Sequence, residues 1–453
     1  MRNDLFAFVL IVACFISGFA RAEILHIQNV QSPGGLTVWL VEDHSLPVVA
    51  MTFAFRTGAT QDTPDKQGIT QLLSNTLDEG YGNVPSREFQ AALRDNAINL
   101  SFSSSRDSFG GSLRTLTRHL PQAQLLMQGA IMAPRFDQEA VDRMRAANIS
   151  RVKSSLADAD WIAARILNDL MYKGHPYALN AGGTVQSLAG LTSADLREVR
   201  STHFAKSRLA IGMTGDISPD AAGKMADMIF GNLPERSDAP PVADAAFPKG
   251  GKPVYFARDI PQTSLSIAWP GIDLHDPDYY ASVVMTYIFG GGGFSSRLME
   301  EIREKRGLTY GIYASQYNLD HADRVVVSAS LLPQNVAMTI EIAKQLASGM
   351  QATPVDAATL KSAQDYLTGS LPLQFSSTGR TSAALAELQL NDRPITALDD
   401  FRTGILAVTP ADIQHVATRI FNADPVIVAV GARPVGIDMD EWTAIPNAET
   451  TTK

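Results

Sequence analysis

The sequence predicts an α+β protein made of two homologous domains, each a mostly antiparallel sheet covered by helices. Three observations predict this fold: an internal repeat, the order of strands and helices in each half, and an aperiodic segment between the halves. The 453 residues suffice for two hydrophobic cores, because a domain typically holds about 100–200 residues. We expect a first domain over 23–232, a linker over 233–252 and a second domain over 253–453.

The internal repeat is clearest between "LTSADLREVRSTHFAKSRLAIGMTGDIS" and "VTPADIQHVATRIFNADPVIVAVGARPV". In each copy the pattern Thr-x-Ala-Asp-Leu/Ile-x-x-Val begins a helix, with Thr192 or Thr409 as its N-cap. A β-rich run follows the helix and ends at Gly215 or Gly431. The starts of the halves, "GLTVWLVEDHSLPVVAMTFAFRTGA" and "GKPVYFARDIPQTSLSIAWPGID", each predict two strands followed by a helix. Each half therefore runs strand, strand, helices, strand, helices, strand, which is an α+β order.

The segment between the halves is "LPERSDAPPVADAAFPKGGK". It is rich in Pro, Ala, Asp and Gly and has no hydrophobic periodicity. Such a composition is typical of a linker.

The N-terminus, "MRNDLFAFVLIVACFISGFARAE", predicts a secretory signal peptide over 1–22. An apolar run over 5–19 is followed by an A-x-A cleavage site before Glu23. The run is shorter than the roughly 20 residues that a spanning helix needs. The residues before Cys14 could instead form a lipoprotein cleavage site, but the apolar run continues past Cys14, which favours simple export. We expect a periplasmic protein that is not attached to a membrane after cleavage.

Composition excludes several classes of site and partner. Cys14 is the only cysteine and leaves with the signal, so the mature chain should contain no disulfide and no thiolate metal ligand. The net charge of −9 makes nucleic acid and anionic lipid poor candidates for partners.

The stretch "GITQLLSNTLDEG", over 68–80, has the pattern of a short amphipathic helix. Asp62-Thr63-Pro64 precedes it as a helix start signal and Gly80 ends it. Its apolar stripe consists of Ile69, Leu72, Leu73, Thr76 and Leu77. Its polar face carries Gln71, Ser74 and Asn75, whose spacing of three and four places them side by side. Taken alone, such a face is most simply interpreted as solvated.

The longer segment "TGATQDTPDKQGITQLLSNTLDEG" resembles the inverzincin metallopeptidases, the family of pitrilysin, insulin-degrading enzyme and mitochondrial processing peptidase. In that family this helix carries H-x-x-E-H, in which both His bind zinc and the Glu acts as general base. The matching residues here are Gln71, Ser74 and Asn75. The family's third ligand is a Glu on a later helix, and Arg151 in "ANISRVKSS" is closest to that position.

Each of these substitutions removes a property that zinc binding or catalysis requires. An amide is a weaker zinc ligand than an imidazole, a serine hydroxyl cannot accept a proton as a carboxylate does, and a cation repels zinc. The eight histidines include no pair three to five residues apart, and His175 in "KGHPYALNAGG" has the features of a packing residue. The resemblance therefore implies a lost metal site, no cofactor in this chain, and no peptide hydrolysis by this chain alone.

The segment "IFGGGGFSSRLMEEIREKRGLTYGIYAS" is the most distinctive of the second half. Its glycines do not match a phosphate loop, because no Lys-Ser/Thr pair follows them. It resembles the family's second domain, where an Arg and a Tyr hold the substrate and steady the oxyanion, and the matching residues are Arg303 and Tyr310. The alternatives are an ion pair of Arg303 with Glu300 and a core position for Tyr310; the two residues together in this context favour the functional interpretation.

The resemblance implies half of a clamshell peptidase, whose chamber admits peptides and whose partner chain carries H-x-x-E-H and zinc. We expect a non-catalytic subunit of a heterodimeric periplasmic zinc peptidase, with Arg303 and Tyr310 completing the partner's site. One alternative is a peptide-binding or scaffolding protein with no catalytic connection. Another is an enzyme that uses Asp78 and Glu79, which is disfavoured because a solvated acidic pair beside Gly80 is ordinary at a helix end.

Overall fold

The computed structural model describes residues 24–446, so the expected signal peptide lies outside the described residues. The first half contains a six-stranded sheet in which all pairs are antiparallel except β2 with β8. From edge to edge its strands are β1 (Gln28–Gln31), β2 (Thr37–Glu42), β8 (Leu209–Gly215), β3 (Val48–Phe55), β7 (Phe109–Leu116) and β6 (Asn99–Ser104).

The second half contains another six-stranded sheet, in which five strands repeat the order of the first. From edge to edge its strands are β11 (Thr309–Leu319), β12 (Ala322–Leu331), β10 (Thr263–Pro270), β13 (Val426–Gly431), β9 (Val254–Ala257) and β14 (Asp440–Glu441). When the outer strands β1 and β14 are left out, the spatial orders of the two sheets are β2-β8-β3-β7-β6 and β9-β13-β10-β12-β11. Numbered along the chain, both read first, last, second, fourth, third. This shared order confirms the prediction of two homologous α+β units.

The literal repeat in the sequence corresponds to one repeated structural unit. The helices α7 (Ser193–His203) and α14 (Pro410–Phe421) both begin with a capping box, formed by Thr192 with Asp195 and by Thr409 with Asp412. Each helix leads into a buried central strand, β8 or β13, as predicted.

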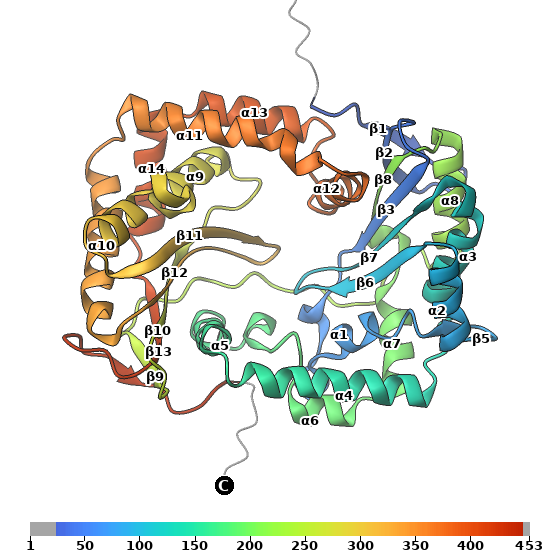
Figure 1. Ribbon diagram of the computed structural model, residues 1–453, viewed down its shortest axis with the longest axis horizontal. Coiled ribbons are helices and arrows are strands. Elements are labelled where there is room, and N and C mark those ends of the chain that lie inside the picture. The colour runs from blue at the N-terminus through green and yellow to red at the C-terminus, as the bar shows by residue number, and fades with distance from the viewer. Residues whose placement is uncertain (1–23, 447–453) are drawn as a thin grey trace, which may run out of the picture.

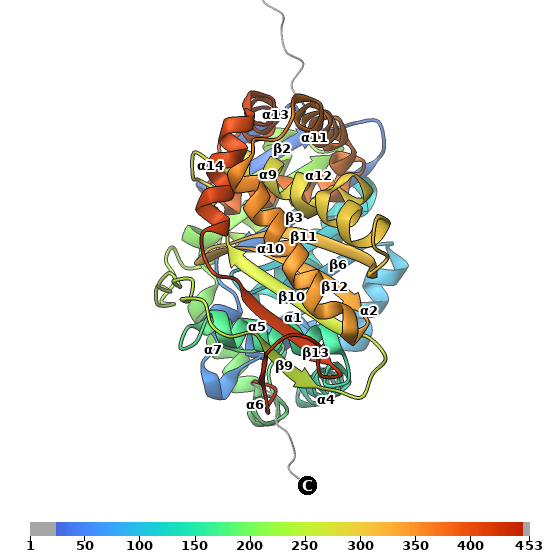
Figure 2. The same ribbon diagram turned by 90° about the vertical axis from the view of Figure 1, so that its left-hand side faces the viewer.

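Helices cover the outer face of each sheet (Figures 1 and 2). The helices of the first half are α1 (Ile69–Ser74), α2 (Ser86–Asp95), α3 (Leu120–Met132), α4 (Gln138–Ser155), α6 (Val185–Gly190), α7 and α8 (Pro219–Phe230). Those of the second half are α9 (Tyr279–Thr286), α10 (Val336–Ala352), α11 (Ala357–Ser370), α13 (Ala397–Ala407) and α14. Apolar side chains of these helices and of the sheets form one main hydrophobic core in each half, in which α4, α11 and α13 pack on other helices rather than on a sheet.

The inner face of each sheet is covered by a helix from the other half. Helix α12 (Thr378–Leu390) packs on β8 and β3 of the first sheet, and α5 (Ala159–Met171) packs on β13 and β10 of the second (Figure 1). The Thr52 and Ser382 hydroxyls are 2.9 Å apart where α12 crosses β3. Where α5 packs on the second sheet, Ile162 and Ile166 join strand residues of that sheet in a third core. The two sequence halves are therefore interlocked, although each builds its own sheet.

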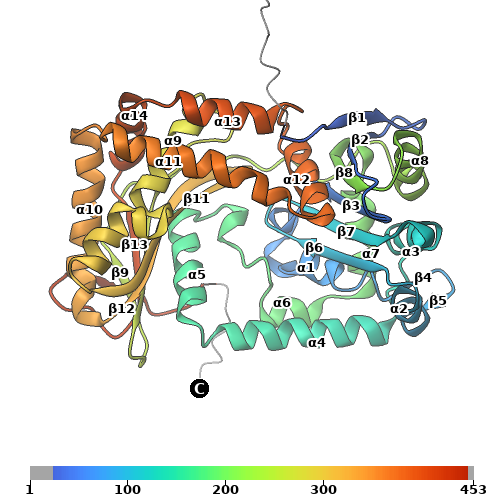
Figure 3. The same ribbon diagram turned by 45° about the horizontal axis from the view of Figure 1, so that its top comes forward.

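The elements around the degenerate motif lie at one edge of the first sheet. Helix α1 contacts both the edge strand β6 and the long helix α4, and lies between them (Figure 3). Within residues 24–446, no helix is both long enough and apolar enough to span a bilayer.

Candidate functional site

The helix that carries the degenerate motif is shorter than the sequence predicts. It begins after Gly68 and ends at Ser74, and the chain then turns through to Gly80. Gly68 is required there, because its φ is +84° and a Cβ would lie 2.7 Å from the backbone of Gly183. The apolar stripe is confirmed, since Ile69, Leu72, Leu73, Thr76 and Leu77 are all buried.

Asp62 anchors the start of α1. Its Oδ2 accepts a 2.9 Å hydrogen bond from the Gly68 amide, and its Oδ1 accepts one from the Thr70 hydroxyl at 2.5 Å. Burial raises the pKa of Asp62 to about 7, because desolvation outweighs these hydrogen bonds.

The three residues at the motif positions are joined by hydrogen bonds to one another. Gln71 Nε2 donates to Ser74 Oγ at 3.1 Å and to Asn75 Oδ1 at 3.3 Å, and Ser74 Oγ donates to the Gln71 carbonyl at 2.8 Å. Ser74 is buried and the other two are partly buried, so the interpretation as a solvated face is wrong.

The network continues onto α4 through Asn148. Asn75 Nδ2 donates a 2.7 Å hydrogen bond to Asn148 Oδ1, and the Arg151 guanidinium donates to the same oxygen. The structure thus brings together the four residues expected at the metal positions, with Asn148 as the link between Asn75 and Arg151. The side-chain groups of this network are amides, a hydroxyl and a guanidinium. None of them is an imidazole, thiolate or carboxylate, the groups that zinc prefers as ligands.

Among residues 24–446, no cluster of three or more His, Cys, Asp or Glu side chains could hold a metal ion. His175 has the packing role expected from the sequence. Its Nδ1 accepts a hydrogen bond from the Tyr177 amide at 3.1 Å, and its Nε2 lies 2.8 Å from the Ala243 carbonyl oxygen.

The acidic pair after α1 is not solvated, contrary to the prediction. Glu79 is buried, forms an ion pair with Arg143, and accepts a hydrogen bond from the Ser86 hydroxyl. Asp78 has a raised pKa, chiefly because of burial. A carboxylate that is held by a guanidinium and a hydroxyl serves the packing of α2 and α4 around it.

The distinctive segment of the second half places Arg303 and Tyr310 at the edge of the second sheet. Arg303 lies on the helical segment Met299–Glu304, and Tyr310 follows at the start of β11, the outermost strand. Gly307, with φ +62°, makes the turn between them.

Both alternative interpretations of this pair are wrong. Arg303 forms no ion pair with Glu300, which instead pairs with Lys305 at 2.8 Å. The Arg303 guanidinium lies over the ring of Phe294, 4.3 Å from its centroid. Tyr310 is not a core residue, because 86% of it is exposed. Its phenol is therefore free to meet a ligand or another chain.

The two sets of expected site residues stay apart in this chain. Within the part of the chain that the structure describes, no hydrogen bond or ion pair joins the α1–α4 network to Arg303 or Tyr310. Sequence reasoning missed two residues, Asn148 and Phe294. Asn148 precedes Arg151 by three residues on one helix, a spacing that could have signalled a shared face. Phe294 follows the four glycines, and the only signal was an apolar side chain in an otherwise polar turn.

Comparison with known families places both halves in one group. Residues 37–184 match the profile described as insulinase, peptidase family M16, and residues 190–367 match the peptidase M16 inactive domain. A non-peptidase homolog named YmxG from Helicobacter pylori is 26% identical over 377 residues, covering 82% of this chain and 84% of that protein. An uncharacterized zinc protease YmxG from Bacillus subtilis is 19% identical, covering 88% of this chain and 96% of that protein.

Solved structures share the same fold. A peptidase M16 inactive domain from Pseudomonas fluorescens superimposes with a TM-score of 0.84 at 25% identity, covering 90% of this chain and 98% of that chain. A protease from Helicobacter pylori superimposes with a TM-score of 0.80 at 16% identity, covering 90% of this chain and 99% of that chain. At 16% identity the second similarity shows the fold alone.

Proposed function

Because this chain belongs to the insulinase family of peptidases, family M16, as a member without the zinc-binding residues, we propose that it is a non-catalytic subunit of a heterodimeric zinc peptidase. In this proposal a homologous chain with H-x-x-E-H binds the zinc, and this chain supplies Arg303 and Tyr310 to that site. The signal-like pattern of residues 1–22 supports a periplasmic location for the complex.

One observation carries the proposal: Tyr310 is exposed on the edge strand that follows the helical segment of Arg303, while the four metal positions of the same chain hold only amides, a hydroxyl and a guanidinium. A tyrosine with 86% of its surface exposed contributes little to folding, so its phenol is available for another molecule.

The chemistry of the pair suits a substrate that develops negative charge. A phenol and a guanidinium both donate hydrogen bonds, and such donors stabilise the oxyanion of a tetrahedral intermediate. Stacking on Phe294 restricts the Arg303 guanidinium before any ligand arrives, which reduces the entropy lost on binding. The partner would supply the zinc, the general base and the attacking water.

The test is to purify the mature chain alone and together with an exported homologue that carries H-x-x-E-H. We expect zinc and peptide cleavage only in the mixture. Zinc-dependent cleavage by the isolated chain would refute the proposal.

A substitution then separates site completion from assembly. Tyr310→Phe should lower the turnover of the complex by about 100-fold, the usual cost of losing one oxyanion donor, and leave assembly intact. Tyr366→Phe is the matched control, because Tyr366 is also exposed but stacks on Tyr287. If Tyr310→Phe leaves turnover unchanged in an assembled complex, the remaining role is that of a peptide-binding or scaffolding subunit.

A further inference from the structure

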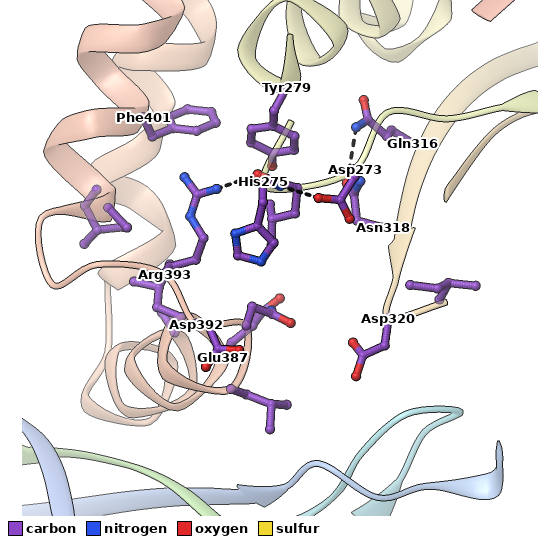
Figure 4. Close-up of a pocket in the computed structure, with 18 of the residues that line it drawn as sticks. Asp273, His275, Tyr279, Gln316, Asn318, Asp320, Glu387, Asp392, Arg393 and Phe401 are labelled. Atoms are coloured by element: carbon purple, nitrogen blue, oxygen red, sulfur yellow. Dashed lines mark hydrogen bonds between the residues drawn. The ribbon is translucent and has the colours of Figure 1, made fainter. Parts of the chain in front are cut away.

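A hollow of about 730 Å³ lies where the two interlocked halves meet, away from both sets of residues described above. Its walls are the β11–β12 turn, the loop before α9, the end of α12 and the start of α13 (Figure 4). Arg56, directly after β3, also lines it. The lining does not include the residues of the α1–α4 network, Gln71, Ser74, Asn75 and Arg151, nor Arg303 and Tyr310. Its volume is that of a small-molecule or peptide side-chain site.

The charged residues of this hollow are mostly acidic. Four carboxylates line it, from Asp273, Asp320, Glu387 and Asp392, against the guanidinium groups of Arg56 and Arg393. With neutral histidines, the lining therefore carries an excess of negative charge.

Both guanidinium groups already have partners. Arg56 forms a 2.9 Å ion pair with Asp392 and so joins β3 to the chain after α12. Arg393 donates to the Leu274 carbonyl at 2.6 Å and to the Tyr280 hydroxyl at 3.0 Å. Neither guanidinium forms an ion pair with Asp320 or Glu387, although the charge of Arg56 partly stabilises the Asp320 carboxylate.

Asp320 and Glu387 face the hollow from opposite walls, Asp320 from the β11–β12 turn and Glu387 from α12 (Figure 4). Within residues 24–446, neither side chain has a hydrogen bond or an ion pair. The pKa of Asp320 is raised, first by desolvation and then by the neighbouring carboxylate of Asp107. A cation bound between these walls would stabilise the charged form of Asp320 against both the desolvation and the repulsion by Asp107.

The rest of the lining is mixed: its apolar and aromatic part includes Leu274, Tyr279, Phe375, Leu388 and Phe401, and its polar part consists of histidines and side-chain amides such as His275, Gln316 and Asn318. The Asp320 and Glu387 residues are exposed to solvent, and the apolar side chains between them match a hydrocarbon stem that ends in a charged head.

We propose that this hollow binds an organic cation on an apolar stem, held by the carboxylates of Asp320 and Glu387. A lysine side chain of a peptide has this chemistry, and so has a free polyamine. The inference goes beyond the proposed function, because it concerns a site formed by this chain alone and requires neither zinc nor a partner.

The experiment is titration calorimetry of the isolated mature chain at low salt. The probes are an acetylated and amidated pentapeptide with lysine between leucine and phenylalanine, the same peptide with norleucine for lysine, and spermidine. We expect the lysine peptide to bind at least about tenfold more tightly than the norleucine peptide, which is what about 1.4 kcal/mol from one charged contact provides. Tighter binding of spermidine than of the lysine peptide would identify the free amine as the source and still support the site.

Variants connect this binding to the two carboxylates. Asp320→Asn combined with Glu387→Gln should remove the preference for the cation and change the circular dichroism spectrum little. Glu341→Gln is the control, since it removes an exposed carboxylate from α10 on the outer side of the same half. Equal affinity for the lysine and norleucine peptides together with no binding of spermidine, or an undiminished preference in the double variant, would overturn the proposal.

Discussion

The Asn75 amide donates a 2.7 Å hydrogen bond to the Oδ1 atom of Asn148, and this contact ties α1 to α4. In a metal-binding relative, zinc would join these two helices through its ligands. Here a chain of side-chain hydrogen bonds from Gln71 to Arg151 makes the connection. At these positions the two helices are therefore linked directly by side-chain hydrogen bonds.

Removal of the shared acceptor should destabilise the protein. In Asn148→Ala, the partly buried Asn75 amide loses its acceptor and the exposed Arg151 loses a partner that water can replace, so we expect a loss of about 1–2 kcal/mol of unfolding free energy. Urea unfolding followed by circular dichroism measures this loss. Lys153→Ala, an exposed change on the same helix, should stay within about 0.5 kcal/mol of the wild type, and an equally small effect of Asn148→Ala would show that the link carries no stability.

Restoring zinc binding should require replacement of Arg151 as well as of Gln71, Ser74 and Asn75. Gln71→His, Ser74→Glu and Asn75→His with Arg151→Glu should bind about one zinc ion per chain, because this set restores a ligand combination that zinc prefers. The triple variant that keeps Arg151 should bind much less, since the guanidinium lies one hydrogen bond from Asn148 and close to position 75. Atomic absorption after dialysis compares the two; equal zinc content would show that Arg151 does not oppose the metal.

The contact between α12 and the first sheet depends on Gly212. A Cβ at this position would lie 2.2 Å from the Ser382 carbonyl oxygen and 2.7 Å from the Ala386 nitrogen, so Gly212→Ala should push α12 away and cost about 1–3 kcal/mol. Gly349→Ala is the matched control, because Gly349 lies in α10 and the added Cβ would meet no atom within 4 Å beyond the helix's own nearby backbone. That change should stabilise the protein by about 0.5–1 kcal/mol in the same urea assay. A neutral Gly212→Ala would mean that the helix can shift at no cost.

Asp62 should make a measurable contribution to the pH dependence of stability. Its folded-state pKa of about 7 lies above the ordinary value, so its contribution is complete at low pH and is lost as the pH rises toward 7. The stability of the wild type relative to Asp62→Asn should therefore fall with rising pH, by up to about 1.4 kcal/mol per unit between roughly pH 4 and 7.

Urea titrations of both proteins from pH 5 to 8 give this difference. Comparison with the variant is essential, because burial lowers the pKa of His203 to about 4 and its titration works in the opposite direction. His203 is present in both proteins and cancels in the difference. A difference that does not change with pH would contradict a raised pKa at Asp62.

The fold was largely predictable because its signals are local. Thr192 and Thr409 are followed three residues later by Asp195 and Asp412, and such capping boxes fix helix starts without any tertiary information. The alternation of apolar residues and the glycines at 215 and 431 similarly mark where the central strands end.

The same signals could not predict that α5 and α12 would each pack on the sheet of the other half. Each helix has an amphipathic pattern that fits the face of either sheet, so the pattern does not say which half it will cover. In the site, Gln71, Ser74, Asn75 and Arg151 were identified by resemblance, whereas Asn148 became visible only when α4 was placed against α1. The hollow near Asp320 is formed by segments far apart in the chain, and no motif marks it.

The crossing of α5 and α12 means that a nick in 233–252 would not release two separable fragments. Each fragment would still have a helix inserted beneath the other's strands, and would leave a bare apolar face if pulled away. Substitutions at the motif positions leave this crossing intact, whereas removal of either half would uncover the apolar face that its helix protects in the other.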